Sequence, residues 1–128
     1  MSYHFNKTVD MDIDAAEARV TELLKERGFG VLTHIDVQAT MKKKLDEDMP
    51  AYRILGACNP SFAFKALSSE KLIGTMLPCN VIVRDAGDGR TEVAAVDPIA
   101  SMQGVDNPAL GEIANEVQGR MRSLIEDL

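Results

Sequence analysis

Residues 52–60, YRILGACNP, predict a strand that is followed directly by a helix, and the predicted fold depends on this segment. Alternation predicts a strand at residues 52–58, whose one side carries Tyr52, Ile54, Gly56 and Cys58. Asn59-Pro60 predicts that a helix follows, because asparagine is a favoured N-cap and proline suits the first helical position. Gly56 removes a side chain just before the cysteine, and such a glycine often marks the close approach of another backbone or of a ligand.

The second cysteine lies in Leu77-Pro78-Cys79-Asn80, where the next strand is predicted to begin. The chain has only two cysteines, and an asparagine follows each. If the two strands are antiparallel neighbours, the sulfurs of Cys58 and Cys79 lie close together. If a right-handed parallel crossover joins the strands, the sulfurs lie at opposite ends of the sheet. The sequence leaves both arrangements open.

Hydrophobic periodicity divides the rest of the chain into strands and helices. We predict further strands at residues 3–9, 30–37, 80–85 and 91–97, and helices at residues 13–27, 36–45, 60–70 and 108–128. Residues 72–77 are expected to be a connector and residues 99–106 an irregular link. Gly87-Asp88-Gly89 predicts a hairpin turn in a loop of four or five residues. Helices mixed with such a hairpin predict an α+β fold, a two-layer sandwich with about five largely antiparallel strands covered by helices.

Several helix starts and one long apolar stripe are readable in the sequence. Asp12 and Asp14 are candidate N-caps of the first helix, Asp36 of the second, and Asn107-Pro108 repeats the cap-plus-proline start. The final helix carries the longest stripe, namely Leu110, Ile113, Ala114, Val117, Met121, Leu124, Ile125 and Leu128. A stripe of this length could cover a sheet or form part of a dimer contact.

Composition bounds the class of protein. The chain of 128 residues is expected to form a single domain, residues 1–128, and its formal charge is −6. An acidic chain is a poor partner for phosphate backbones, so we expect no nucleic-acid binding. No apolar run approaches the roughly 18 residues of a membrane span, and the N-terminus lacks a signal-peptide pattern. We therefore expect a cytoplasmic protein without a membrane partner, whose cysteines are reduced at rest.

The cysteine segments offer the only cluster in the sequence that suggests chemistry. Cys58 immediately precedes a predicted N-cap, and the positive end of a helix favours a nearby thiolate. Free cysteine is also often a small buried hydrophobic residue, and Asn59 is explained as a cap. Two sulfurs without a paired histidine leave a zinc site short of ligands, so we predict no metal. No phosphate-binding loop, dinucleotide fingerprint or nucleophile elbow identifies a cofactor or a hydrolase.

The quoted segments resemble those of the domain-of-unknown-function 302 family. Residues 52–60 and 77–80 carry the resemblance, and residues 28–32, 35–37 and 96–98 also fit that family in the same order. The resemblance covers nearly the whole chain. It implies a small bacterial or archaeal α+β protein, often dimeric, with no established activity. It assigns no role to the cysteines, because a fold does not determine a function.

Two functions follow as hypotheses. The favoured one is a ligand-binding or assembly module for a small molecule, in which the last helix helps to hold a homodimer. Its pocket would be lined by Tyr52, Gly56, Cys58 and Met76, with Asn59, Pro60, Cys79 and Asn80 completing the candidate ligand-binding residues. The alternative is a thiol-dependent redox or nucleophilic enzyme, with Cys58 as the reactive thiol and Cys79 as its resolving partner.

Overall fold

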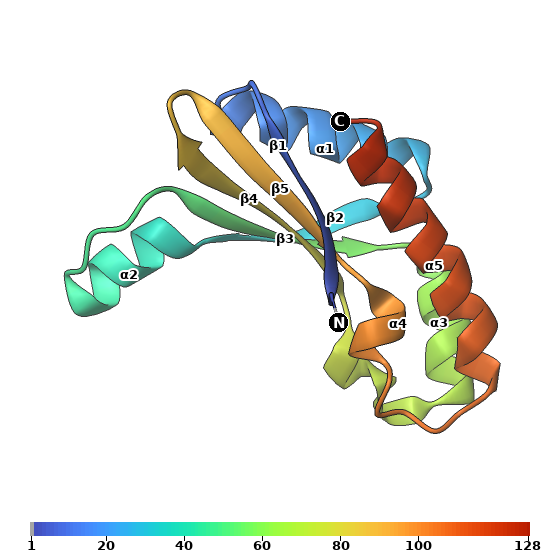
Figure 1. Ribbon diagram of the computed structural model, residues 1–128. Helices are drawn as coiled ribbons and strands as arrows, with labels where there is room; N and C mark the ends of the chain where they lie inside the picture. Colours follow the sequence, from blue (N-terminus) through green and yellow to red (C-terminus); the bar gives the residue numbers. More distant parts are fainter. Residues whose placement is uncertain (1) are drawn as a thin grey trace.

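The computed structural model describes residues 2–128, which form five strands and six helical segments in the order shown in Figure 1. The strands are β1 (His4–Val9), β2 (Gly30–Asp36), β3 (Tyr52–Cys58), β4 (Cys79–Gly87) and β5 (Arg90–Val96). The helices are α1 (Ile13–Glu26), α2 (Val37–Leu45), α3 (Pro60–Ser69), the 3-10 helix η1 (Lys71–Met76), α4 (Pro98–Ser101) and α5 (Ala109–Glu126).

The strands form one sheet in the order β1-β5-β4-β3-β2, and every neighbouring pair is antiparallel. Helices α1 and α5 pack on one face of this sheet, and α3 and α4 pack on α5 near the strand ends (Figure 1), so the predicted α+β architecture of an antiparallel sheet with helices on it is confirmed. The apolar faces of α1 and α5 need a partner surface, and one face of the sheet supplies it.

The core lies between the sheet and the helices α1 and α5. Its strand side is built by Leu55, Val81, Val83 and Val93, each at most 1% exposed. Its helix side includes the buried residues Val20, Leu23, Leu24, Met121 and Leu124. The apolar stripe of α5 is thus used inside the chain, with Leu110, Ala114, Val117, Met121, Leu124 and Ile125 buried. Of the two uses that the sequence left open for this stripe, the structure shows that it covers the sheet.

Side-chain caps fix the helix starts close to where the sequence predicts them. Asp12, not Asp14, caps α1 by accepting a hydrogen bond from the Ala15 amide, and Asp36 caps α2 through the Ala39 amide. Helix α5 begins two residues after Asn107, whose side-chain oxygen accepts from the Ala109 amide at 3.0 Å. Short polar side chains satisfy amides that a first helical turn leaves free.

Three connections are more regular than the sequence suggested. The hairpin between β4 and β5 has a two-residue turn, because Gly87 pairs with Arg90. Asp88 and Gly89 both have positive φ, 56° and 74°, which suits a tight type I′ turn and corrects the longer loop that we expected. The connector after α3 is the helix η1, and the link after β5 begins with α4, which Asp97 caps.

The other face of the sheet carries no helix from the main layer. A row of apolar residues crosses it, because Ile54 pairs with Ile35 on one side and with Ile82 on the other. Helix α2 is set apart at the far end of β2 and β3, as Figure 1 shows, and buries none of its residues. We call this surface the open face and the helix-bearing surface the covered face.

Candidate functional site

The antiparallel pairing of β3 and β4 decides the position of the two cysteines. Ala57 pairs with Cys79, so the end of β3 lies beside the start of β4. Cys58 is the next residue along β3 and is therefore one position from that pair. The arrangement that brings the sulfurs together is the one that the structure adopts, and both thiols are free.

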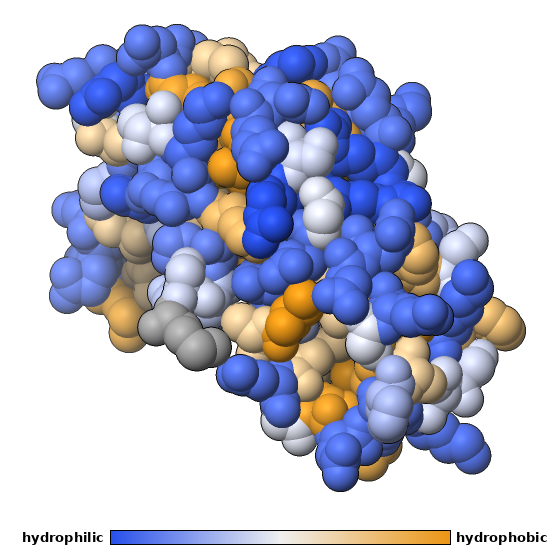
Figure 2. Space-filling view, turned by 45° about the vertical axis from the view of Figure 1, so that its right-hand side comes forward, coloured by the Kyte–Doolittle hydropathy of each residue, from blue (hydrophilic) through white to orange (hydrophobic). Residues whose placement is uncertain are grey.

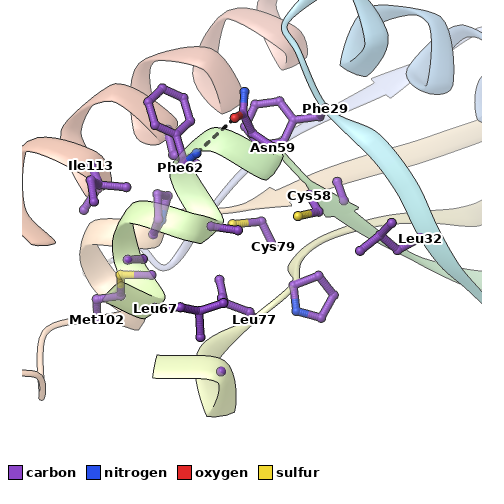
Figure 3. A pocket seen from close by; sticks show the side chains of 18 residues that line it. Phe29, Leu32, Cys58, Asn59, Phe62, Leu67, Leu77, Cys79, Met102 and Ile113 are labelled. Carbon is purple, nitrogen blue, oxygen red and sulfur yellow. Dashed lines mark hydrogen bonds between the residues drawn. The ribbon is translucent and has the colours of Figure 1, made fainter. Parts of the chain in front are cut away.

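A cavity of about 350 Å³ opens at this end of the sheet, between the strand ends and the helices α3, α4 and α5. Figure 3 shows both sulfurs among the side chains that line it. The lining residues are Phe29, Leu32, Ala57, Cys58, Asn59, Phe62, Ala63, Ala66, Leu67, Gly74, Leu77, Pro78, Cys79, Pro98, Met102, Ile113, Ala114 and Val117. None of them carries a charge, and the volume is that of a small-molecule site.

Two of the apolar residues that line the cavity are exposed. They are Leu32 and Leu67, which are 68% and 42% exposed. Phe64, Leu72 and Met76 do not line the cavity but are exposed on α3 and η1, two helices that contribute to its wall. In Figure 2 hydrophobic side chains gather at the lower end of the molecule, where α3, η1 and α4 lie, whereas the surface over α1 and α5 is mainly hydrophilic. A ligand approaching this opening meets an apolar surface.

The two thiols differ in their surroundings. Cys79 is only 9% exposed, and burial raises its pKa to about 11, with a further contribution from the neighbouring Cys58. Burial acts this way because it disfavours the charged thiolate. Cys58 is half-buried. The wall of the cavity therefore holds one deeply buried thiol that stays protonated at neutral pH and one that solvent reaches.

Asn59 is held as a structural cap at the cavity wall. Its side-chain oxygen accepts a hydrogen bond from the Phe62 amide at 3.1 Å, as marked in Figure 3. A Cβ added to Gly28 would lie 2.9 Å from the Asn59 side-chain nitrogen, and Gly28 has a φ of +83°. The end of α1 therefore comes close to the start of α3 only because residue 28 has no side chain.

The remaining predicted ligand-binding residues do not line this cavity. Tyr52 and Asn80 lie on the open face, because side chains alternate along each strand. Pro60 occupies the first turn of α3, and Met76 is 43% exposed at the end of η1. The space beside Gly56 is already filled by protein side chains, since a Cβ added there would come within 2.2 Å of Thr33 Oγ1 and 2.7 Å of Pro78 Cγ. The close approach expected at this glycine is made by two side chains of the protein.

Most lining residues that the sequence did not single out come from helices. Phe62 and Leu67 are on α3, Met102 follows α4, and Ile113 is on α5. Helical spacing predicts inward-facing positions for Phe62, Leu67 and Ile113, and this is the only signal that the sequence offers. Met102 lies in the link that we expected to be irregular, so no such signal pointed to it. Periodicity shows that a side chain turns inward, but it does not show where opposing side chains fail to fill the space between them.

A second, more polar groove of about 420 Å³ lies on the open face and includes Tyr52 and Asn80. Glu92 accepts hydrogen bonds there from Asn6 at 2.9 Å and from Arg84 at 2.7 Å. These partners, Asn6 first and Arg84 second, hold the pKa of Glu92 below the ordinary value of a glutamate. The charges in this groove are thus paired within the protein.

Residues 2–128 contain neither a cluster of metal ligands nor a membrane-spanning helix. No group of three histidine, cysteine or carboxylate side chains that could hold a metal ion occurs among them. The cavity contributes two thiols, which is fewer ligands than a structural zinc ion takes. No helix in the same residues is long and apolar enough to cross a bilayer.

Comparison with known proteins gives a family and a structural relative. The protein is similar to a solved structure, the crystal structure of an uncharacterized conserved DUF302 protein from Bacillus stearothermophilus, at 28% sequence identity and a TM-score of 0.89. The similarity covers 98% of each chain. No curated protein matches the sequence. The model of the family "Domain of unknown function DUF302" matches residues 5–128, and the chain therefore belongs to this family.

Proposed function

We propose that this protein is a binding module for a small, uncharged, apolar molecule held in the cavity between α3, α5 and the ends of β3 and β4. The single observation that carries the proposal is the lining, which has no charged side chain and contains both thiols. An uncharged apolar ligand loses little hydration on entering such a site, whereas a charged ligand would lose its hydration without gaining a partner.

The same lining argues against one form of the alternative, a nucleophilic thiol enzyme that depends on an activating base. A nucleophilic cysteine is usually activated by an adjacent base, and none of the described residues that line the cavity is a histidine or a carboxylate. Asn59, the polar side chain next to Cys58, already accepts a hydrogen bond from the Phe62 amide. Binding therefore needs no group beyond those present, whereas base-assisted nucleophilic catalysis by Cys58 would need a further one.

An uncharged fluorescent probe such as N-phenylnaphthylamine tests the binding proposal. We expect saturable binding that the variant Leu67→Lys weakens by about tenfold or more, because it places a charge at the apolar opening. Leu72→Lys is the matched control, since Leu72 is 77% exposed in the adjacent η1 and does not line the cavity. Equal affinities for the two variants, or no saturable binding by the unaltered protein, would contradict the proposal.

We also propose that the protein is a homodimer in which α2 of one copy packs on the open face of the other. Helix α2 has apolar residues Val37, Met41 and Leu45 at four-residue spacing but buries none of them. The open face carries an apolar row, Ile35, Ile54 and Ile82, that no helix of the described chain covers. One chain thus carries both halves of a self-complementary contact, as a two-fold interface requires.

The open face is large enough to take α2 of a second copy. Five strands about 4.8 Å apart and roughly 20 Å long give a face of roughly 480 Å² before side-chain relief is counted. Helix α2 has 9 residues and is about 13.5 Å long, so it covers only part of this face, and the contact is smaller than the roughly 800 Å² per copy of a standard interface. Sedimentation should show a dimer that Leu45→Lys shifts towards monomer and Leu72→Lys does not. A monomer at every concentration, or an equal shift by both variants, would contradict this proposal.

We propose a cytoplasmic location for this function. Both cysteines are unpaired, and a reducing compartment maintains free thiols.

A further inference from the structure

The two thiols of the cavity are positioned for exchange with one another. A residue one position from an antiparallel pair lies about 3.4 Å along the strand from a partner about 5 Å away, which gives a Cα separation of roughly 6 Å. Disulfides form across about 4.4 to 6.8 Å between Cα atoms. Ala57 pairs with Cys79, so Cys58 and Cys79 have this relation.

The direction of the two side chains agrees with this separation. Strict alternation would place Cys58 and Cys79 on opposite faces of the sheet. However, β3 ends at Cys58 and the chain turns at once into α3, so both side chains line the same cavity. Figure 3 shows the two sulfurs on the same side of the strand ends, and the electrostatic effect of Cys58 on Cys79 agrees with their being neighbours.

We propose that Cys58 and Cys79 reduce small uncharged disulfides that enter the cavity, with Cys58 as the attacking thiol and Cys79 as the resolving thiol. This inference rests on the proposed binding function, because it names a substrate class for the same cavity. The unequal exposure of the two thiols sets their order: a molecule from solution meets the half-buried Cys58 before Cys79, which is 9% exposed.

The exchange is balanced without any further reactant. The Cys58 thiol loses its proton to water, and its sulfur attacks one sulfur of the disulfide RSSR. A mixed disulfide forms on Cys58, and RS⁻ leaves and is protonated. Cys79 then loses its proton and attacks the Cys58 sulfur, so that the protein disulfide forms and the second RS⁻ leaves as RSH. The two cysteines are oxidised, and RSSR is reduced to two RSH molecules.

The chemistry of the lining selects the substrate class. No lining residue is charged, so an RSSR with charged groups would enter without a counter-charge. Cys58 is also the only titratable side chain besides Cys79 in the described lining. Because burial raises the pKa of Cys79 to about 11, its thiolate is scarce at neutral pH. The second step should therefore accelerate about tenfold per pH unit below pH 11.

Mass spectrometry of the protein treated with hydroxyethyl disulfide tests the order of the thiols. The intact protein should lose two hydrogen atoms, after a mixed disulfide that decays faster as the pH rises. Cys79→Ser should retain the mixed disulfide on Cys58, and Cys58→Ser should react at least about tenfold more slowly, because its remaining thiol is buried. Cys79→Ala is the second trapping variant if the serine disturbs the core, with folding checked by circular dichroism. Equal rates for the two single variants, or no intramolecular disulfide, would overturn the proposal.

A charged disulfide of similar size, dithiodiglycolate, tests the substrate class. Each rate is divided by the rate of the same reagent with free cysteine. We expect the normalised rate of hydroxyethyl disulfide to exceed that of dithiodiglycolate by about tenfold or more. Equal normalised rates would refute the proposed preference for uncharged disulfides. Binding of the redox-inert naphthylamine without thiol exchange would refute this inference alone, and exchange without probe binding would refute the proposed binding function.

Discussion

Helices α5 and α2 both carry apolar residues at helical spacing, yet only one of them finds a partner within the chain. Helix α5 buries six residues, most of them against the covered face of the sheet and Leu110 against α3 and η1, whereas α2 buries none. A polar side chain just before each helix, Asp36 for α2 and Asn107 for α5, accepts a hydrogen bond from an amide of the first turn, so their local sequence signals are alike. Periodicity thus specifies a helix and its apolar side, whereas the topology of the chain determines whether another element covers that side.

Leucine truncation in the two helices gives the largest expected difference. Leu124→Ala in α5 should lower the free energy of unfolding by about 2 to 5 kcal/mol, because the side chain is fully buried and leaves a cavity. Leu45→Ala in α2 should change it by less than about 0.5 kcal/mol in dilute protein, since Leu45 is 64% exposed. Urea denaturation at several concentrations measures both. A dimer through α2 would make only the Leu45 effect depend on concentration, and equal losses in dilute protein would break the comparison.

Two glycines in neighbouring strands differ in the space around them, because Gly56 is closely packed and Gly30 is not. Gly56→Ala should cost about 1 to 3 kcal/mol of stability, because the new methyl group meets Thr33 and Pro78. Gly30→Ala is the control, with no atom within 4 Å of its added Cβ, and should lie within about 0.5 kcal/mol of the unaltered protein. Adding Thr33→Ala should recover part of the Gly56→Ala loss in thermal unfolding. The absence of any recovery would assign the strain to Pro78 alone.

Removal of the helix caps should distinguish global from local opening. Asn59→Ala and Asp36→Ala each remove one cap hydrogen bond, worth about 1 kcal/mol. Helix α3 buries Ala66 in a cluster with Ile73 of η1 and Leu110 of α5, so the Asn59 change should lower global stability. Helix α2 buries nothing, so the Asp36 change should mainly speed hydrogen exchange within α2. Equal losses in global unfolding would show that α2 is coupled to the core.

Alkaline pH should lower the free energy of unfolding through Cys79, whose thiol is buried. Its pKa of about 11 in the folded protein exceeds the roughly 8.5 of an exposed cysteine. The folded state therefore holds a proton that the unfolded chain releases, and stability falls as pH rises from about 8.5 to about 11. At pH 9 the effect is below about 1 kcal/mol. Unfolding of Cys79→Ala across this range should show a shallower decline, and an unchanged decline would contradict the assignment.

Acid should weaken the open face through Glu92, with the smallest expected effect. Its lowered pKa means that the ionised carboxylate is stabilised by Asn6 and Arg84 in the folded state. This contribution is present above the ordinary pKa of a glutamate and is lost as pH falls through the lowered value. Glu92→Gln should cost about 0.5 kcal/mol of stability at pH 7, and this cost should shrink as the pH falls through the lowered pKa of Glu92. Urea midpoints across a series of acidic pH values measure the change, and a loss that does not vary with pH would exclude the charge as its cause.

Local signals in the sequence were sufficient for most of the architecture. The alternation of residues 52–58, the cap at Asn59 and the stripe of α5 each depend on residues near one another in the chain. The loop around Asp88-Gly89 is shorter than the sequence predicts. Gly87 and Arg90 pair with each other, so the two strands extend beyond the residues whose alternation identifies them. The regular segment η1 carries too few residues to show a period.

The order of amino acids is enough to place two thiols at the ends of two strands, with a helix beginning directly after the first. The folded chain adds that these strand ends are neighbours, that Tyr52 and Asn80 lie on the open face, and that α3, α4 and α5 leave a space between them. Strand alternation and helix periodicity can be read from the sequence because they are local properties of the chain. A cavity is a shortage of packing among segments distant in sequence, and no single segment encodes it.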